Sequence, residues 1–430
     1  MPKIERKKKI TGARFDPTAP PRLSEREQIM QAIAESQRVA DELARAQRDA
    51  ERARLATQAL GLAPAAAGNR GDGNFHIAFV QMGQGDCAVM STPAGKIILI
   101  DCGTNSKDLE NGAAYKDRIA AVLTGVRFLA ATNVINVLIL THPDKDHYNR
   151  LGEVLPDAVT VELVYHSAAL GDYGTVTSSW VHNHATDARF RRRLFLSRDP
   201  AGGRGANTMQ PGDKLVPELI AAAPAMGSKI DKMEGARGLV VFDEGAGCKI
   251  TLMAAGVDHD YTDETGKGDD DTGTHRNRGS VVTLVETFTK KILICGDATR
   301  STERFMMLDA ARRTALNDVD IIQVGHHGSN VTSSGQTFVD TVRPRHRAVI
   351  SAGRRGNPKH HLPGKDVVDR YVQRFVASGH AADAVAHVVS AWGPFGTSAD
   401  PLSVDVTQPV YSTGSSGTLY FDISPAGVIT

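Results

Sequence analysis

This chain of 430 residues has few cysteines and almost no net charge. Its four cysteines stand far apart and form no CxxC pair, which argues against a disulfide framework and predicts buried free thiols in a reducing compartment. The net charge of +1 gives no overall attraction to nucleic acid, so any such affinity must be local. No apolar run approaches the length of a membrane span, and the basic N-terminus lacks the apolar segment of a signal peptide. We therefore expect a cytoplasmic protein that makes no contact with a membrane.

Residues 1–23 are polar, basic and proline-bearing, a composition that predicts a disordered tail. Ser24 opens a capping box, and the residues after it favour a helix over 24–61. The apolar stripe of this helix is thin, so two interpretations stay open: a solvated arm, or a helix that pairs with a second copy or with a partner protein. Residues 62–73 are rich in alanine and glycine and are typical of a linker, which places the globular domain over 74–430.

Short apolar runs separated by turn signals predict strands along the globular domain. The first runs follow one another through tight turns, which indicates antiparallel pairing. Later runs alternate with helical patterns, which indicates an α/β layered domain. The expected strands cover 75–80, 88–92, 96–100, 134–140, 159–165, 239–242, 248–254, 280–287, 291–295, 321–324 and 348–350, and the expected helices cover 116–129 and 151–155.

The strand expected over 134–140 ends in a loop that holds four potential metal ligands, His142, Asp144, Asp146 and His147. Backbone that leaves the end of a strand can curl so that alternate side chains converge. Two imidazoles and two carboxylates then offer neutral nitrogen and anionic oxygen to one or two divalent cations. The competing interpretation is a polar loop that merely holds these residue types, and the matching partners downstream argue against it.

Three further apolar strands end in polar clusters, which hold Asp297, the pair His326 and His327, and Asn357. Ligands collect outside the carboxyl ends of strands in parallel-type sheets, so we expect these clusters and the His/Asp loop to form one site. A single cluster of this kind is commonplace, whereas four of them at strand ends together predict a metal centre.

A basic segment interleaved with phenylalanines is the best local candidate for contact with a nucleic acid. Its arginines are Arg189, Arg191, Arg192 and Arg193. A solvated helix face explains the same pattern, and both interpretations stay open. The Gly-rich turn over 83–86 can hold a phosphate on backbone N–H groups, although we favour a purely structural role for its glycines.

The sequence resembles the metallo-β-lactamase superfamily, and within it the soluble hydrolase domain of the ComEC competence-channel type, because several of its motifs occur in the same order along the chain. The motifs that carry the resemblance are Gly83–Cys87, Ile100–Gly103, the His/Asp loop, Asn277–Ser280, Gly296 and Asp297 with Glu303, Gly325–Ser329, Ser351–Gly353 with Asn357 and His361, and Ser412–Gly417. The resemblance implies a four-layer αββα sandwich with a metal site at the open edge of the two sheets. It also implies hydrolysis, with nuclease or phosphodiesterase activity favoured over lactam cleavage.

On this resemblance the metal ligands are His142, Asp144, Asp146, His147 and Asp297, with His326 or His327 completing one coordination sphere. Asp297 is the expected bridge, because a carboxylate at a strand end can present both oxygens. Asp144 stands where the broader superfamily has histidine, and a further histidine ligand is replaced by a region where His275, Asn277 or neither binds. Fewer nitrogens and more carboxylate oxygens favour manganese or magnesium over zinc. We therefore expect two divalent ions, Mn²⁺ or Zn²⁺, with Mg²⁺ as a further option.

Metals bound in this way would lower the pKa of a bound water and create a hydroxide nucleophile. Asp146 either binds metal or acts as a base that orients this water, while His327 or His361, together with Ser329, steadies the developing anion. Asn277 and Asn357 join the arginine segment as candidate substrate contacts. Three other histidines are expected to stay outside the chemistry: His166 supports the loop, and His76 and His387 are ordinary polar positions.

Three functions are compatible with these residues. The leading one is a metal-dependent phosphodiesterase that acts on DNA or RNA. The second is hydrolysis of a small ester, thioester or lactone, which a narrow apolar pocket without a basic groove would favour. The third is a metal-stabilised binding or assembly module that docks a partner through the helix at 24–61. Intact ligand residues at every expected strand end argue against lost catalysis.

Overall fold

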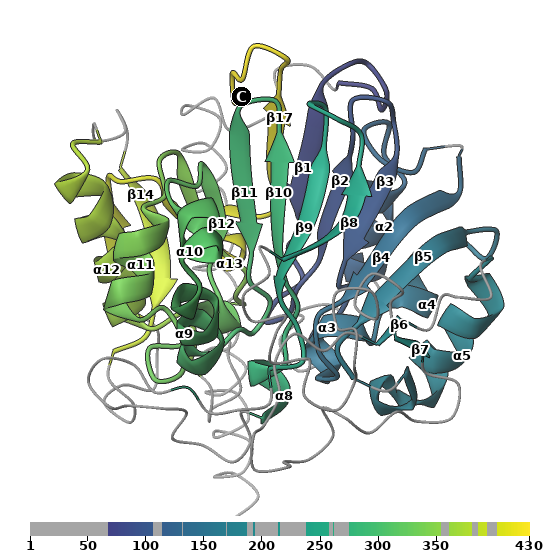
Figure 1. Cartoon of the computed structure of the whole chain (residues 1–430), viewed down its shortest axis with the longest axis horizontal. Helices are drawn as coiled ribbons and strands as arrows, with labels where there is room; N and C mark the ends of the chain where they lie inside the picture. Colours follow the sequence, from purple (N-terminus) through teal and green to yellow (C-terminus); the bar gives the residue numbers. More distant parts are fainter. Residues whose placement is uncertain are drawn as a thin grey trace, which may run out of the picture. The chain divides into compact units, whose positions relative to one another are not determined.

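Two large β-sheets form the centre of the fold in the computed structural model (Figure 1). The structure describes residues 68–105, 114–130, 132–168, 170–186, 192–193, 214–215, 238–257, 261, 275–353, 361–380, 386–393 and 402–430. All of these residues belong to one unit, Asp49–Thr430. The expected tail over 1–23 and helix over 24–61 lie outside the described residues, as do Arg189, Arg191, Asn357 and the side chains of Arg192, Arg193 and His275.

The first sheet has eight strands in the order β17-β1-β2-β3-β4-β5-β6-β7. Their bounds are β1 Phe75–Phe79, β2 Ala88–Ser91, β3 Ile97–Ile100, β4 Val134–Leu140, β5 Thr160–His166, β6 Arg192–Arg193, β7 Lys214–Leu215 and β17 Leu419–Ile423. Neighbours are antiparallel from β17 to β3, as the tight turns predict, and parallel from β3 to β7. The parallel half therefore brings the carboxyl ends of β3, β4 and β5 to one edge of the sheet.

The second sheet has seven strands in the order β16-β13-β12-β11-β10-β9-β8. Their bounds are β8 Leu239–Asp243, β9 Lys249–Ala254, β10 Val282–Thr287, β11 Lys290–Ile294, β12 Ile321–Gln323, β13 Arg347–Ile350 and β16 Val410–Ser412. Strands β11, β12, β13 and β16 are parallel, and β8 to β11 are antiparallel. A separate two-stranded sheet pairs β14 (His387–Ala391) with β15 (Leu402–Val406).

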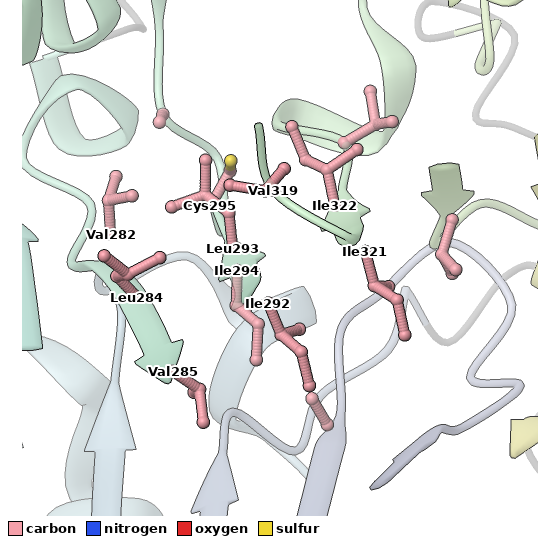
Figure 2. Packing of buried hydrophobic residues seen from close by; sticks show 14 of the residues in the cluster. Val282, Leu284, Val285, Ile292, Leu293, Ile294, Cys295, Val319, Ile321 and Ile322 are labelled. Carbon is pink, nitrogen blue, oxygen red and sulfur yellow. The ribbon is translucent and has the colours of Figure 1, made fainter. Parts of the chain in front are cut away.

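Alternate residues of the first sheet face two different apolar cores. Phe75, Ile77 and Phe79 of β1 face the second sheet and join the larger core, part of which is drawn in Figure 2 with side chains of β10, β11 and β12 among those labelled. Ala78 and Val80 point the other way and pack with the helices that cover this sheet. A period of two along a strand buried on both faces explains why these runs are apolar throughout.

Helices cover the outer face of each sheet (Figure 1). On the first sheet, α2, α4 and α5 bury Ile119, Leu151 and Val181, and on the second, α9 and α12 bury Phe305 and Tyr371. The layers therefore run helix, sheet, sheet, helix, which confirms the expected α/β fold. The helices are α2 Ala114–Leu123, α3 Lys145–Tyr148, α4 Leu151–Val154, η1 Leu170–Tyr173, α5 Gly174–His184, α8 His275–Arg278, α9 Arg300–Leu308, α10 Ala310–Leu316, η3 His326–Gly328, α11 Gln336–Val342, α12 Lys365–Ala377 and α13 Thr413–Ser416.

The carboxyl ends of β4 and β11 meet where the two sheets adjoin. The backbone N–H of Val281 donates to the carbonyl of Thr141 at 3.0 Å. Gly296 has a φ of +52°, and a Cβ added to it would lie 2.9 Å from Cβ of Thr141. Glycine is required here both for the left-handed backbone and for the close approach. This contact brings the segment after β11 beside the segment after β4.

Most of the strands agree with the sequence prediction, and β4 has the bounds that its apolar run predicts. The helix expected over 116–129 is shorter, because α2 ends at Leu123 and a turn follows. At the end of the expected linker, the backbone N–H of Arg70 donates to the carbonyl of Val126 at 2.9 Å. None of the helices in the described part of the chain combines the length and the apolar composition that a bilayer crossing requires.

Candidate metal centre

The loop after β4 turns its two histidines into one buried space. A short helix, α3, begins directly after Asp144 and carries Asp146 and His147, so the curl expected from the sequence is a helical turn. His142 and His147 are fully buried, and the centroids of their rings lie 4.1 Å apart. The carboxylates are more open, because the side chains of Asp144 and Asp146 keep 34% and 23% of their surface exposed.

Asp101 fixes the orientation of both imidazoles. It follows β3 with a φ of +56°, which is uncommon for a residue other than glycine. Its Oδ2 accepts hydrogen bonds from Nδ1 of His147 at 2.7 Å and from Oγ1 of Thr141 at 2.6 Å. Because the Thr141 hydroxyl donates to Asp101, it accepts from the Nδ1–H of His142 at 3.2 Å. In their uncharged form, both rings therefore carry the proton on Nδ1 and keep a lone pair on Nε2.

His326 and His327 are held in the same tautomer by other partners. Nδ1 of His327 donates to the carbonyl of Ser351 at 2.7 Å. Nδ1 of His326 lies 2.5 Å from Oγ1 of Thr332, which itself donates to Oγ of Ser329 at 2.9 Å. The Thr332 oxygen is thus the acceptor of the His326 Nδ1 proton, and in the uncharged form of each ring Nε2 again carries the lone pair.

Asp297 follows β11 and stands between the four imidazoles, with 4% of its side chain exposed. Its Oδ1 lies 3.2 Å from Nε2 of His147 and 3.5 Å from Nε2 of His327. Its Oδ2 lies 3.7 Å from Nε2 of His142 and 3.6 Å from Nε2 of His326. Residues separated by more than 150 positions in the sequence are therefore assembled around one carboxylate, as the strand-end pattern predicts.

The donor set fits divalent cations. Among the described residues, the buried Nε2 atoms of His142, His147 and His327 and the Oδ1 of Asp297 have no hydrogen-bond partner. Imidazole lone pairs and carboxylate oxygens repel one another unless a proton or a cation lies between them. Four groups that can hold an ion have ligand atoms within 4.8 Å of one another: His142, His147 and Asp297; Asp146, His147 and His327; Asp86, Asp297 and His327; and Asp86, Asp101 and His147.

The charges of the cluster shift the pKa values of its members in opposite directions. Burial by itself raises the pKa of Asp146, but the nearby imidazoles of His327 and His147 outweigh it and lower that pKa to about 2. Burial lowers the pKa of His327, but Asp297 and Asp146 outweigh it and raise that pKa to about 10. The pKa of His147 is likewise raised against burial by Asp297 and Asp101. Protons therefore occupy, at neutral pH, positions that a cation would take over.

Two carboxylates of the cluster, Asp86 and Asp101, are absent from the site proposed on sequence grounds. Both stand in motifs already noted, directly after the glycine of the 83–86 turn and directly after β3. A Cβ on Gly85 would lie 2.2 Å from the carbonyl oxygen of Gly103, and a Cβ on Gly103 would lie 2.4 Å from the backbone nitrogen of His147. These glycines let three loops touch, and that close packing is the signal that points to Asp86 and Asp101.

Other sequence-predicted residues lie beside the cluster or away from it. Ser329 reaches it only through Thr332, which holds His326. Asn277 donates from Nδ2 to Nε2 of His326 at 3.1 Å. His361 stacks on a tryptophan ring, with centroids 4.0 Å apart, and is in none of the four ion-holding groups found among the described residues.

The three histidines expected outside the chemistry differ from one another. His166 hydrogen-bonds a backbone carbonyl two residues further on, and His387 hydrogen-bonds the backbone of β16. His76 is likewise in none of the four ion-holding groups of the described residues, and its ring is fully buried between Asp422 and Asp72, at 2.7 and 3.0 Å. The sequence pattern gave no indication of the pairing with Asp422, which lies 346 positions further along the chain.

Basic residues reach the same edge of the molecule. Arg276, in α8, has 64% of its side chain exposed, and its Nη1 lies 3.4 Å from Oδ1 of Asp144. In the first sheet, Arg193 of β6 pairs with His166 of β5, and His166 pairs with Leu140 of β4. The backbone of Arg192 and Arg193 therefore runs beside the end of β5, next to β4.

No family model matches the chain, and neither does any curated protein. Solved structures to which it is similar include the metallo-β-lactamase fold protein YhfI from Bacillus subtilis, at 9% identity and a TM-score of 0.32 over 70% of this chain and 94% of that one. They also include the short form of human tRNase Z, at 14% identity and a TM-score of 0.33 over 64% and 91% of the two chains. A third is the diiron β-hydroxylase CmlA from Streptomyces venezuelae, at 11% identity and a TM-score of 0.35 over 72% and 52%.

Proposed function

We propose that this chain is a divalent-metal-dependent hydrolase of phosphodiesters, with DNA or RNA strands as the first candidate substrates. The observation that supports it most is the position of Asp297, whose two oxygens each face two imidazole nitrogens at 3.2 to 3.7 Å. The proposal also agrees with the resemblance of the sequence motifs to the metallo-β-lactamase superfamily.

The residues of the cluster divide into ligands and residues that hold them. His142, His147, Asp146 and Asp297 would bind the cations, and Asp101 keeps the two imidazoles in the tautomer that binding requires. Divalent ions held there supply Lewis-acid activation of water and of a phosphoryl oxygen. Burial of the imidazoles keeps bulk water from competing for their nitrogens, and the more open carboxylates mark the side from which a substrate enters.

A phosphodiester suits the charge on the open side of the cluster. The guanidinium of Arg276 stands there, and its Nη1 lies 3.4 Å from Oδ1 of Asp144. A cation bound by Asp144 would weaken that ion pair and leave the guanidinium available to a phosphate oxygen. Strand β6, which consists of Arg192 and Arg193, pairs with β5 at the same edge, and two basic residues there favour an extended polyanion over a small neutral ester.

The direct test measures cleavage of single-stranded DNA, RNA and bis-p-nitrophenyl phosphate by the full chain with Mn²⁺. We expect Asp297→Asn and Asp146→Asn to lower each rate by more than about 100-fold, because losing a metal ligand should reduce activity more than losing a residue that hydrogen-bonds a ligand, which costs about 10- to 100-fold. The matched control is Asp366→Asn, an exposed carboxylate of α12, which should leave the rates unchanged. Undiminished cleavage in both cluster variants would reject the assignment of the site.

The choice of substrates separates the competing functions. Cleavage of the nucleic acids together with the small diester supports the proposal, whereas cleavage of p-nitrophenyl acetate alone supports a small-ester hydrolase. Binding of Mn²⁺ without cleavage of any of these compounds would support the binding module. Each result is read against the Asp297→Asn variant, which separates activity of this site from a contaminating nuclease.

A further inference from the structure

Glu303 of α9 is a buried carboxylate that belongs to none of the ion-holding groups found among the described residues. Its Oε1 accepts a hydrogen bond from the backbone N–H of Ser334 at 2.6 Å, and its Oε2 accepts one from the backbone N–H of Gly335 at 2.8 Å. Both donors belong to the segment over residues 329–335, which follows η3 and which we call the 329–335 loop. Both oxygens of Glu303 therefore hold the backbone of one loop beside the metal centre.

The 329–335 loop carries the residue that orients His326. Oγ1 of Thr332 lies 2.5 Å from Nδ1 of His326 and accepts its proton. The loop also folds back on the segment after β12, because Oγ of Ser333 lies 2.9 Å from the carbonyl oxygen of Gly325. The direction of the His326 ring therefore depends on where the backbone of this loop is held.

Arginines on two helices fix the same loop at other points. The backbone N–H of Arg300 donates to the carbonyl of Thr332 at 2.7 Å, and its Nη2 donates to the carbonyl of Asn330 at 2.9 Å. From α12, the guanidinium of Arg370 donates to the carbonyl of Ser334. These arginines bind carbonyl groups of the loop, whereas the carboxylate on α9 binds its N–H groups. Helix α9 therefore supplies both donors and acceptors to the loop.

We propose that Glu303 is a positioning residue of the metal centre that acts through Thr332. It holds the 329–335 loop and thereby keeps Nε2 of His326 directed at Asp297, 3.6 Å from its Oδ2. Helix α9 begins three residues after Asp297, so it links this carboxylate to the loop that orients the histidine. The proposal rests on the proposed function for the presence of cations, and it adds a residue that touches neither a cation nor the substrate.

The backbone of the loop depends on the carboxylate of Glu303. Ser334 is fully buried and has a left-handed φ of +55°, which is uncommon for a residue other than glycine. A buried N–H group without an acceptor is costly, because water cannot reach it. Loss of the carboxylate would leave two neighbouring N–H groups of this turn unsatisfied. The loop would then shift until water reached these groups, and Thr332 would shift with it.

The ionisation of Glu303 changes how firmly it holds the loop. Burial raises the pKa of this carboxyl to about 8, although the two backbone N–H groups and the charges of Arg300 and Arg370 act against it. Tyr371 of α12 and Cys295, directly after β11, also face the carboxyl, and burial raises the pKa of each, so both stay uncharged. An ionised carboxylate accepts with both oxygens, whereas a protonated one carries a hydrogen on one of them. The loop is therefore held most firmly above about pH 8.

The test measures the Mn²⁺ affinity of the full chain by calorimetric titration, for wild type and for Glu303→Gln. Glutamine keeps the size of the side chain and one acceptor oxygen, but its NH₂ group meets a backbone N–H. We expect the affinity to fall by about tenfold at about pH 8.5, the lower end of the range for residues that support a metal ligand. At about pH 7 the loss should be smaller, because the wild-type carboxyl is then largely protonated.

A second variant separates positioning from a general loss of stability. Because Glu303 acts through His326, adding Glu303→Gln to His326→Ala should change the Mn²⁺ affinity by less than about twofold. A merely structural role predicts the same loss in both backgrounds. The control is Asp320→Asn, since this carboxylate also accepts from a backbone N–H, that of Lys291 at 2.9 Å, but precedes β12 at the end away from the cluster. It should lower the free energy of unfolding and leave the Mn²⁺ affinity unchanged at both pH values.

Hydrogen exchange of the metal-free protein gives a readout that needs no cation. Backbone amides of the 329–335 loop should exchange several-fold faster in Glu303→Gln than in wild type at equal pH, while those of β12 stay unchanged. The proposal is overturned by equal Mn²⁺ affinity in wild type and Glu303→Gln, or by an equal loss in the His326→Ala background. A loss that does not grow with pH, or unchanged exchange of the loop, would overturn it as well.

The proposed function is judged on different data, namely cleavage. A wild-type chain that binds Mn²⁺ and shows the expected effects of Glu303→Gln, but cleaves no phosphodiester, would reject the proposed function and leave the role of Glu303 standing. Cleavage together with any of the four contrary results would reject the role of Glu303 alone. A wild-type chain that binds no Mn²⁺ would overturn both.

Discussion

Nδ1 of His147 lies 2.7 Å from Oδ2 of Asp101, and this contact joins the end of β3 to the metal cluster. The same oxygen accepts from the hydroxyl of Thr141, while Oδ1 accepts from the Thr141 backbone N–H at 2.8 Å. One carboxylate thus satisfies three donors of the His/Asp loop. Because Asp101 is 1% exposed, water cannot replace it in these bonds.

Replacement of Asp101 by asparagine should weaken metal binding without removing any ligand. An amide presents only one acceptor oxygen, so either His147 or Thr141 loses its partner, and the His147 ring is no longer held in the tautomer that binds. We expect the affinity for Mn²⁺ to fall by roughly 10- to 100-fold, as for other partners of metal-binding histidines. Calorimetric titration measures this, with Asp366→Asn as control, and an unchanged affinity would mean that Asp101 has no part in orienting His147.

Gly103 should tolerate no side chain. A Cβ there would lie 2.4 Å from the backbone nitrogens of His147 and Tyr148, and these backbone atoms cannot move without displacing the loop. We expect Gly103→Ala to lower the free energy of unfolding by roughly 1–3 kcal/mol and to reduce Mn²⁺ binding as well. Urea unfolding and metal content check this. Gly247→Ala, whose nearest contact would be Pro93 at 3.4 Å, is the control, and equal behaviour of the two variants would contradict the prediction.

Arg276 should affect substrate binding more than turnover. Its guanidinium is exposed and lies beside Asp144, so it can contact a phosphate without taking part in the reaction. We expect Arg276→Ala to raise KM for a phosphodiester by about tenfold, the effect of one charged hydrogen bond, with little change in kcat. Arg276→Lys should recover part of the loss, and KM for a neutral ester should not change. A fall in kcat with KM unchanged would place Arg276 in the chemistry instead.

The sequence predicts the ligands of the cluster better than the residues that hold them. His142, Asp146 and Asp297 follow apolar strands, and this local pattern can be recognised in the amino-acid sequence alone. Asp101 also follows a strand, but its role depends on the register between β3 and β4, which no local pattern records. The directions in which His326 and His327 point could not be predicted either, because they depend on the left-handed backbone of both residues, which composition does not indicate.

Metal affinity should rise with pH through the neutral range. Burial lowers the pKa of His327, but Asp297 and Asp146 raise it to about 10, so a cation must displace a proton from this ring. Release of one proton increases the apparent affinity by about tenfold per pH unit below that pKa. When a chelator keeps the protein free of metal, stability instead falls as the pH rises. The raised pKa of His327 stabilises the fold fully below about pH 6.5, the pKa of histidine in the unfolded chain, and this contribution is lost as the pH rises toward 10. Mn²⁺ titrations and urea unfolding between about pH 6 and pH 8 test both directions.

The buried pair of His76 and Asp422 should make stability depend on pH independently of the cluster. Burial by itself lowers the pKa of His76, but the hydrogen bond from its Nδ1 to Asp422, at 2.7 Å, and the charges of Asp422 and Asp72 outweigh it and raise that pKa. The raised pKa means that the pair stabilises the fold fully below about pH 6.5 and less as the pH rises through the folded-state value. Asp422→Asn leaves the imidazole and Arg127 without their carboxylate, at a cost of about 3 kcal/mol.

The loss in Asp422→Asn should therefore be largest below pH 6.5 and smaller at higher pH, where the wild-type pair has given up its proton. Urea unfolding of wild type and variant, both with chelator present, measures the difference as a function of pH. Asp405→Asn, in the separate two-stranded sheet, is the control and should follow the wild-type profile. A difference that stays constant with pH would mean that His76 is neutral in the folded protein, and that Asp422 acts mainly through the guanidinium of Arg127, to which it is bonded at 2.9 Å.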